Sequence, residues 1–288
     1  MQARTDGEMM ERILSFAKED QRVRAVWMNG SRANPNAPKD RWQDFDIVYA
    51  VTDMPSFLES DGWLGCFGER VMMQSRRDQF DAYADGAPDF SGWFIYLMQF
   101  ADGTRIDLSL VPAENAAREV LADKMCIPLL DKDGILPEVP PATDEDYRVP
   151  PPSALEFHCC VNEFRWICCG NVAKSVARGE LSTAQEMLGR YLRKELLQML
   201  SWKASVLHGP VNPGKYGKFL PRFLPKEDWA EFLSTYAGGD FTAFRSALSA
   251  AWRLFSRVSG EVAAALSFPL DREEEARVLR YLREAGCL

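Results

Sequence analysis

A proline-rich, acidic stretch, V-P-P-A-T-D-E-D-Y-R-V-P-P-P-S over 139–153, constrains the fold more than any other feature of this sequence. Proline fixes φ and lacks a backbone donor, so neither a helix nor a central strand can run through such a segment. The stretch also lacks apolar periodicity, which is typical of a linker. Apolar residues recur in short runs before it and at helical spacing after it. With 288 residues in all, the chain is predicted to form two domains, residues 1–145 and 146–288.

The first half alternates short apolar runs with turns. The pair Asp102-Gly103 between two such runs is a strong hairpin signal. A helix is expected from about residue 5 to 18. The expected strands are 23–28, 44–51, 70–74, 93–100, 104–111 and 127–130.

The second half is predicted to be helical, since its apolar residues recur every three or four positions. The expected helices are 153–178, 182–207, 226–236, 240–266 and 271–285. The fold class is therefore α+β, with a mixed-sheet N-terminal domain followed by a C-terminal α-helical bundle.

The stretch from Val26 to Val51 carries the first chemical signal. Gly30-Ser31 forms a turn without bulky side chains, and its N–H groups and hydroxyl suit a phosphate. Asp44 and Asp46 follow on a strand, where alternate residues share a face and these two lie roughly 7 Å apart. That spacing suits oxygens that bind two divalent ions about 3.5–4 Å apart. The pattern predicts nucleotidyl transfer.

A third carboxylate is expected on the hairpin. In the run 104–111, Arg105, Asp107 and Ser109 fall on one face, and the residues between them are apolar. Asp107 thus stands where a hydrophobic residue would be usual. If this strand lies next to 44–51, Asp107 completes a three-carboxylate metal site.

Composition limits the classes of molecule that this protein is expected to bind. The formal net charge of −8 argues against nucleic acid, which selects a basic surface. An acidic surface suits a cationic substrate, although solubility alone is an equal explanation. Two histidines and seven cysteines without a C-x-x-C pair argue against zinc and favour reduced thiols in the cytoplasm. No apolar run is long enough to span a membrane, and a monomer is the default.

Longer strings extend the signal beyond the glycine-serine turn and the D-x-D pair. The string M-N-G-S-R-A-N-P-N-A-P-K-D-R-W-Q-D-F-D-I-V-Y resembles the aminoglycoside 6-adenylyltransferases (streptomycin adenylyltransferases), a branch of the polymerase-β-type nucleotidyltransferases. The resemblance covers nearly the whole chain. It continues in W-L-G-C-F-G-E-R (63–70), D-G-T-R-I-D-L-S-L-V-P (102–112), E-F-H-C-C-V-N-E-F (156–164), V-A-K-S-V-A-R-G-E (172–180) and E-F-L-S-T-Y (231–236).

The resemblance implies an N-terminal nucleotidyltransferase domain that uses ATP and Mg²⁺, with two ions expected. Asp44, Asp46 and Asp107 would be the catalytic and metal-binding residues. The residues expected to contact the nucleotide are Gly30, Ser31, Arg32 and Lys174. For Arg32 a solvated loop charge, and for Lys174 a surface lysine, are the alternative interpretations.

The helical domain is expected to bind the acceptor. Glu156 and Glu163 are two turns apart on one predicted helix, among aromatic residues, and would suit a cationic drug, although they could also be solvated surface charges. The general base is Asp107 or another acidic residue such as Glu163.

The predicted reaction transfers AMP from ATP to a hydroxyl of an aminoglycoside and releases pyrophosphate. The resemblance implies that the acceptor is the 6-hydroxyl of streptomycin and that the outcome is antibiotic resistance. Two alternatives remain open. One is the same chemistry on a protein, nucleotide or RNA acceptor, and the other is an inert small-molecule binder on the same scaffold.

Overall fold

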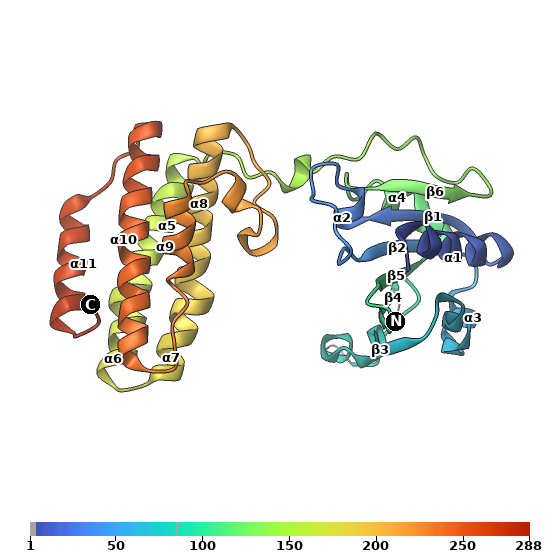
Figure 1. Ribbon diagram of the computed structural model, residues 1–288, viewed down its shortest axis with the longest axis horizontal. Helices are drawn as coiled ribbons and strands as arrows, with labels where there is room; N and C mark the ends of the chain where they lie inside the picture. Colours follow the sequence, from blue (N-terminus) through green and yellow to red (C-terminus); the bar gives the residue numbers. More distant parts are fainter. Residues whose placement is uncertain (1–3, 85) are drawn as a thin grey trace. The chain divides into compact units, whose positions relative to one another are not determined.

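A computed structural model describes residues 4–84 and 86–288 of the chain. The chain folds into two compact units that meet between Asp146 and Tyr147. The first unit contains a β-sheet, and the second is helical (Figure 1).

The sheet unit is built on six strands in the order β3-β4-β5-β2-β1-β6. Only β2 and β5 run parallel, and every other neighbouring pair is antiparallel, so the sheet is mixed. The hairpin predicted around Asp102-Gly103 joins β4 to β5, and Gly103 supplies the positive φ of its turn. The strands are β1 (Val23–Asn29), β2 (Phe45–Val51), β3 (Arg70–Ser75), β4 (Phe94–Phe100), β5 (Arg105–Pro112) and β6 (Ile127–Asp131).

The two faces of the sheet carry separate apolar cores. On one face, helix α1 (Asp6–Glu19), helix α3 (Met54–Leu58) and the 3₁₀ segment η1 (Asp61–Phe67) bury the larger core. On the other face, α4 (Ala116–Val120) packs on Trp27 and Val48. Since alternate residues of a strand share a face, Asp46 lies on the same face as Val48, at the end of this smaller core.

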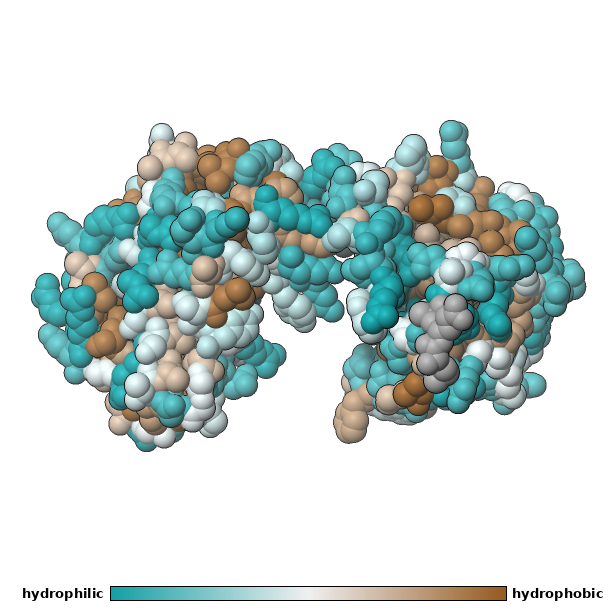
Figure 2. Space-filling model, in the orientation of Figure 1, coloured by the Kyte–Doolittle hydropathy of each residue, from teal (hydrophilic) through white to brown (hydrophobic). Residues whose placement is uncertain are grey.

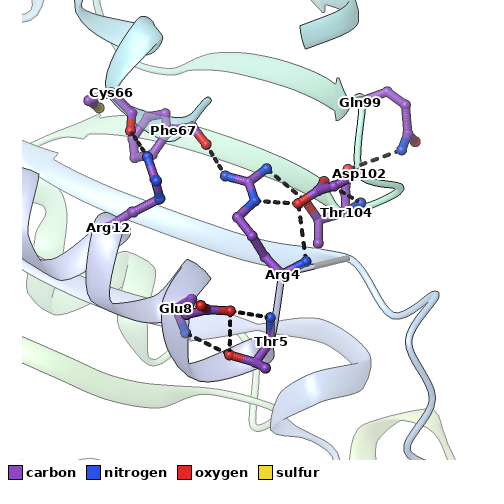
Figure 3. A network of polar contacts seen from close by, with 9 residues as sticks. All are labelled: Arg4, Thr5, Glu8, Arg12, Cys66, Phe67, Gln99, Asp102 and Thr104. Carbon is purple, nitrogen blue, oxygen red and sulfur yellow. Dashed lines mark hydrogen bonds and ion pairs between the residues drawn. The ribbon is translucent and has the colours of Figure 1, made fainter. Parts of the chain in front are cut away.

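The start of α1 is tied to the hairpin turn by Arg4 (Figure 3). Its guanidinium is paired with Asp102 and donates to the carbonyl oxygen of Phe67 and to Thr104 Oγ1. Thr5 caps α1 in a reciprocal capping box with Glu8, as predicted for a helix beginning there. These contacts connect α1 to the turn between β4 and β5.

The helical unit consists mainly of long antiparallel helices (Figure 1). The two predicted helices 153–178 and 182–207 are present, but each is interrupted by one wide π-helical turn, η6 (Ile167–Val172) and η7 (Met187–Leu192). Such turns insert one extra residue into the helical ladder, which helical periodicity alone does not predict. The helices are α5 (Ala154–Trp166), α6 (Ala173–Ala177), α7 (Leu181–Glu186), α8 (Arg193–His208), α9 (Lys226–Leu233), α10 (Phe241–Leu266) and α11 (Arg272–Glu284).

The core of the helical unit is continuous across α5, α8 and α10. Phe164 and Phe255 stack with ring centroids 3.8 Å apart. Asp228 of α9 is almost fully buried, and it is paired with Lys203 of α8 and Arg257 of α10, each at 2.6 Å. Because a buried carboxylate must be neutralised, these two ion pairs link three helices.

The surface of each unit is largely hydrophilic in the view of Figure 2, with apolar residues between the polar ones. Among the described residues, no helix combines the length and apolar character that crossing a membrane requires. The predicted fold class, an α+β chain with a mixed-sheet N-terminal part and a helical C-terminal part, is confirmed.

Candidate active site

Asp46 and Gly30 are in close contact at one end of the sheet. Gly30 follows β1 and begins the short helix α2 (Gly30–Ala33) with φ of +72°. A Cβ atom at this position would lie 2.0 Å from Oδ2 of Asp46. Glycine is therefore required for two reasons, namely its positive φ and the space that the carboxylate occupies.

Asp107 lies beside Asp46, because β2 and β5 pair in parallel register with these two residues opposite each other. The adjacency that the sequence analysis made a condition for a third carboxylate is thus present. Asn29 of β1 lies opposite Asp46 on the other side. A pocket opens over this row, and its lining also includes Gly30, Ser109 and Asp123.

Asp44 precedes β2 rather than belonging to it, since the strand begins at Phe45. Arg32 holds this segment in place. Its guanidinium donates to the carbonyl oxygens of Gln43 and Asp44, at 2.8 and 3.1 Å, and stacks on the ring of Phe45. Another of its nitrogens is paired with Asp6 at 2.6 Å.

The charge around Asp46 is strongly negative. Burial, followed by the negative charges of Asp107 and Asp44, raises the pKa of Asp46 to about 6. Arg105 and Arg32 act in the opposite direction and lower it. Asp107 and Asp44 are therefore close enough to Asp46 to disfavour its ionised form.

Arg105 neutralises part of this charge. It lies two residues before Asp107 on β5 and pairs with it in a bidentate manner, Nε to Oδ1 at 2.7 Å and Nη2 to Oδ2 at 2.8 Å. Its Nε is also 3.7 Å from Oδ2 of Asp44. One guanidinium thus lies between two of the three carboxylates.

The residues suit Mg²⁺ by their chemistry. Carboxylate oxygens are the ligands that this ion prefers. Asp46 lies opposite Asp107 in the strand register, and the charges of Asp107 and Asp44 both raise its pKa. As the side chains stand, however, the described residues contain no group of three or more His, Cys, Asp or Glu close enough together to hold a metal ion. Both carboxylate oxygens of Asp107 are instead paired with the guanidinium of Arg105.

The other residues expected to bind nucleotide are found in different settings. Ser31 is half-buried beside Gly30, and Gln43 Nε2 approaches its hydroxyl at 3.3 Å. Arg32 is directed at the backbone before β2, so its contacts fix the position of Asp44. Lys174 is exposed on α6 of the helical unit. A phosphate contact for each of these residues stays a prediction.

Glu156 and Glu163 line one pocket of about 560 Å³ in the helical unit. This volume is within the range of small-molecule sites, about 300–1,000 Å³. Apolar walls come from residues 150–152 and from Trp202 of α8. Glu195 of α8 adds a third carboxylate. Arg148 is also in the lining, so three carboxylates and one guanidinium surround flat apolar surface. The excess of negative charge suits an organic cation.

Glu156 has a structural task as well. Its carboxylate accepts hydrogen bonds from the backbone N–H of Ser153 at 2.8 Å and from the Ser153 hydroxyl at 2.7 Å, which completes a capping box at the start of α5. These bonds lower the pKa of Glu156 and keep it ionised.

Sequence reasoning did not identify several residues of these two sites. Arg105 was placed on the same strand face as Asp107 but was given no role in the site. Glu195, Gln198 and Trp202 line the helical pocket with i, i+3 and i+7 spacing, which puts them on one face of α8. That spacing predicts a shared helix face but not the element that packs against it. Only the packing of α8 against α5 places these residues near Glu156 and Glu163.

Comparisons with known proteins bear on what this arrangement does. The model of the streptomycin adenylyltransferase family matches residues 3–285. An aminoglycoside 6-adenylyltransferase of Bacillus subtilis is 36% identical over 287 residues, covering 99% of each chain. One of Campylobacter jejuni is 38% identical over 289 residues, covering 98% of each.

A solved structure is also similar. The crystal structure of an aminoglycoside 6-adenyltransferase from Bacillus subtilis covers 99% of this chain with 32% sequence identity and a TM-score of 0.48. The family match over nearly all of the sequence decides the assignment. The chain belongs to the streptomycin adenylyltransferase family and is a nucleotidyl-transferring enzyme.

Proposed function

We propose that this enzyme transfers AMP from ATP to a hydroxyl of an aminoglycoside and releases pyrophosphate. The acceptor we propose is the 6-hydroxyl of streptomycin. The observation that carries the proposal is the register of β2 and β5, which sets Asp46 beside Asp107 next to Gly30. The names of the family and of the relatives support the substrate class.

In the proposed reaction the acceptor oxygen forms a bond to the α-phosphorus of ATP. The bond from that phosphorus to the oxygen bridging the α- and β-phosphates breaks, and pyrophosphate leaves. The hydroxyl proton passes to a carboxylate, either Asp107 or another acidic residue such as Glu163. Gly30 and Ser31 would contact the phosphates, together with Arg32 and Lys174.

Asp44, Asp46 and Asp107 would hold the Mg²⁺ ions. When bound, such ions neutralise the triphosphate and stabilise charge that develops during in-line transfer. The role of this chain's own residues is positional. Arg32 fixes the segment before β2, and Gly30 leaves the space that Asp46 fills.

The glutamate pocket of the helical unit is the proposed site for the cationic groups of the acceptor. Glu156, Glu163 and Glu195 would pair with guanidinium or ammonium groups, and Trp202 would offer apolar contact. The first unit would then act as nucleotidyltransferase domain and the second as acceptor-binding domain. We place the reaction in the cytoplasm, because ATP is available there.

The direct test is to incubate the protein with ATP, Mg²⁺ and a panel of aminoglycosides and to look by mass spectrometry for acceptors that gain AMP. The proposal expects an adduct with streptomycin that forms only when both ATP and the drug are present. Nuclear magnetic resonance of the product then identifies the modified hydroxyl. AMP attached to protein, nucleotide or RNA instead would support a different acceptor. Binding of a drug without turnover would support an inert binder.

A further inference from the structure

Arg105 is paired with two carboxylates, and much of its side chain is exposed to solvent. Two of its three guanidinium nitrogens, Nε and Nη2, donate to the two oxygens of Asp107, and Nε lies 3.7 Å from Oδ2 of Asp44. Its side chain is nevertheless 41% exposed, whereas that of Asp107 is 17% exposed. The guanidinium can therefore move away from the row without opening the apolar core of the sheet.

The pairing occupies the oxygens that the proposed metal site needs. A bidentate guanidinium uses one lone pair on each oxygen of Asp107 and places a full positive charge beside them. A divalent cation at the same carboxylate would meet that charge at short range, where repulsion is strong. The guanidinium and the cation therefore compete for Asp107, and for Asp44 to a smaller extent.

We propose that Arg105 is a built-in counter-ion of the aspartate site, which holds Asp107 and Asp44 until a divalent cation displaces it. This inference rests on the metal role proposed above for the three aspartates. It gives Arg105 a positioning role, in which the residue sets how much divalent cation the enzyme needs. Arg32, whose guanidinium is bound to backbone carbonyls on the other side of Asp44, keeps its place throughout.

The test measures binding of Mn²⁺ alone to the full chain by electron paramagnetic resonance, without nucleotide or drug. Arg105→Gln removes the competing charge, so we expect Mn²⁺ to bind about tenfold more tightly than to the wild type, a usual size for coupling between two sites. Without the cation the variant loses its counter-charge and should unfold at a lower temperature. Added Mn²⁺ should then raise its unfolding temperature more than that of the wild type.

Arg118→Gln is the matched control, because Arg118 is an exposed arginine of the same unit that pairs with Glu119. It removes the same charge from a solvent-exposed side chain that is paired with Glu119, where solvent and salt screen it, so Mn²⁺ affinity should stay within about twofold of the wild type. Arg105→Lys keeps the charge but loses the planar fork, and we expect an intermediate affinity. This second variant decides the matter if Arg105→Gln fails to fold by circular dichroism.

Equal or weaker Mn²⁺ binding in Arg105→Gln would overturn the inference while leaving the metal site in place. A similar gain in Arg118→Gln would also overturn it, since net charge rather than contact would then be the cause. The absence of Mn²⁺ binding in every variant, including the wild type, would contradict the proposed metal role itself.

Discussion

Two groups of carboxylates in this chain differ in how the fold holds them. Asp46 and Asp107 stand on neighbouring strands whose backbone pairing fixes them side by side, and Arg105 supplies a counter-charge. Glu163 and Glu195 stand on two packed helices and line a pocket with apolar walls. The first group is rigid and mutually repelling, whereas the second is spread around a space of molecular size.

This difference indicates that the two groups bind different kinds of cation. Carboxylates forced together by strand register suit small, highly charged ions, because their repulsion is relieved only by concentrated positive charge. Carboxylates spread around an apolar pocket suit a large organic cation, whose charges are dispersed and whose rings need contact surface. Substitutions in the first group should therefore change the rate of transfer, and substitutions in the second should change acceptor binding.

The largest effect is expected at Asp46. Asp46→Asn keeps the shape of the side chain but removes a negative charge from the proposed metal site. We expect kcat to fall at least about a hundredfold, as with the loss of one strong electrostatic contact to a transition state. Relief of repulsion from Asp107 and Asp44 should leave the fold at least as stable. Pyrophosphate release gives the rate, and Glu119→Gln, which changes a half-buried carboxylate of the same unit that is paired with Arg118, should retain it.

A smaller loss is expected at Gly30. Gly30→Ala places a Cβ atom in the space of the Asp46 carboxylate, and we expect kcat to fall about tenfold to a hundredfold, as with misplacement by about 1 Å. Gly179→Ala is a matched control, since Gly179 has the same φ of +72° and nothing within 4 Å of the added atom. Both variants carry the same backbone strain, about 1–2 kcal/mol in unfolding free energy. Equal activity losses would refute the close contact with Asp46 as the cause.

Acceptor binding should respond to the glutamates. Glu163→Gln and Glu195→Gln should each raise KM for the aminoglycoside about tenfold and leave KM for ATP unchanged, which is typical of a lost charged hydrogen bond. A fall in kcat confined to Glu163→Gln would identify Glu163 as the general base. Glu156→Gln is informative, because glutamine can still complete the capping box with Ser153. It should weaken drug binding without loss of helix content. A uniform fall in kcat in all three variants would contradict the division of the two groups into residues for transfer and residues for acceptor binding.

The smallest effect on catalysis is expected at Asp102, a carboxylate that is paired with Arg4 at the start of α1. Asp102→Asn should leave kcat unchanged and lower the unfolding free energy at neutral pH by about 1–3 kcal/mol, the range for hydrogen bonds to charged groups. Asp81→Asn, which removes an exposed carboxylate paired with Arg76, should leave stability nearly unchanged.

The pH dependence of stability follows from the same pair. The side-chain hydrogen bond from Arg4 holds the pKa of Asp102 well below its usual value. A lowered folded-state pKa gives a stabilisation that is present above about pH 4, the unfolded value, and is lost as the pH falls through the folded pKa. The unfolding free energy of Asp102→Asn should therefore fall less steeply than that of the wild type as the pH is lowered below about 4. A variant curve parallel to that of the wild type would show that Arg4 contributes nothing there.

How much the sequence predicted depends on the range of the interaction. Strand alternation and the D-G turn predicted the strands, the hairpin and the shared face of Arg105 and Asp107. The pairing of β2 with β5 could only be assumed when Asp107 was assigned to the site, because strand order depends on the whole domain. Lining of the helical pocket by Glu195 depended on the packing of α8 against α5, which a single sequence does not encode locally. Arg32 was predicted as a phosphate contact, which stays a prediction; that its guanidinium also donates to the backbone before β2 depends on the tertiary fold.

The central claim is that Asp44, Asp46 and Asp107 act as one site, and a multiple-mutant cycle on the rate of AMP transfer to streptomycin tests it most directly. Residues that act as a unit give non-additive losses. The account predicts that the triple Asn variant is no slower than the slowest single variant within about threefold, with an intact fold by circular dichroism. A triple variant whose loss equals the product of the three single losses, or one that transfers AMP at the wild-type rate, would contradict it.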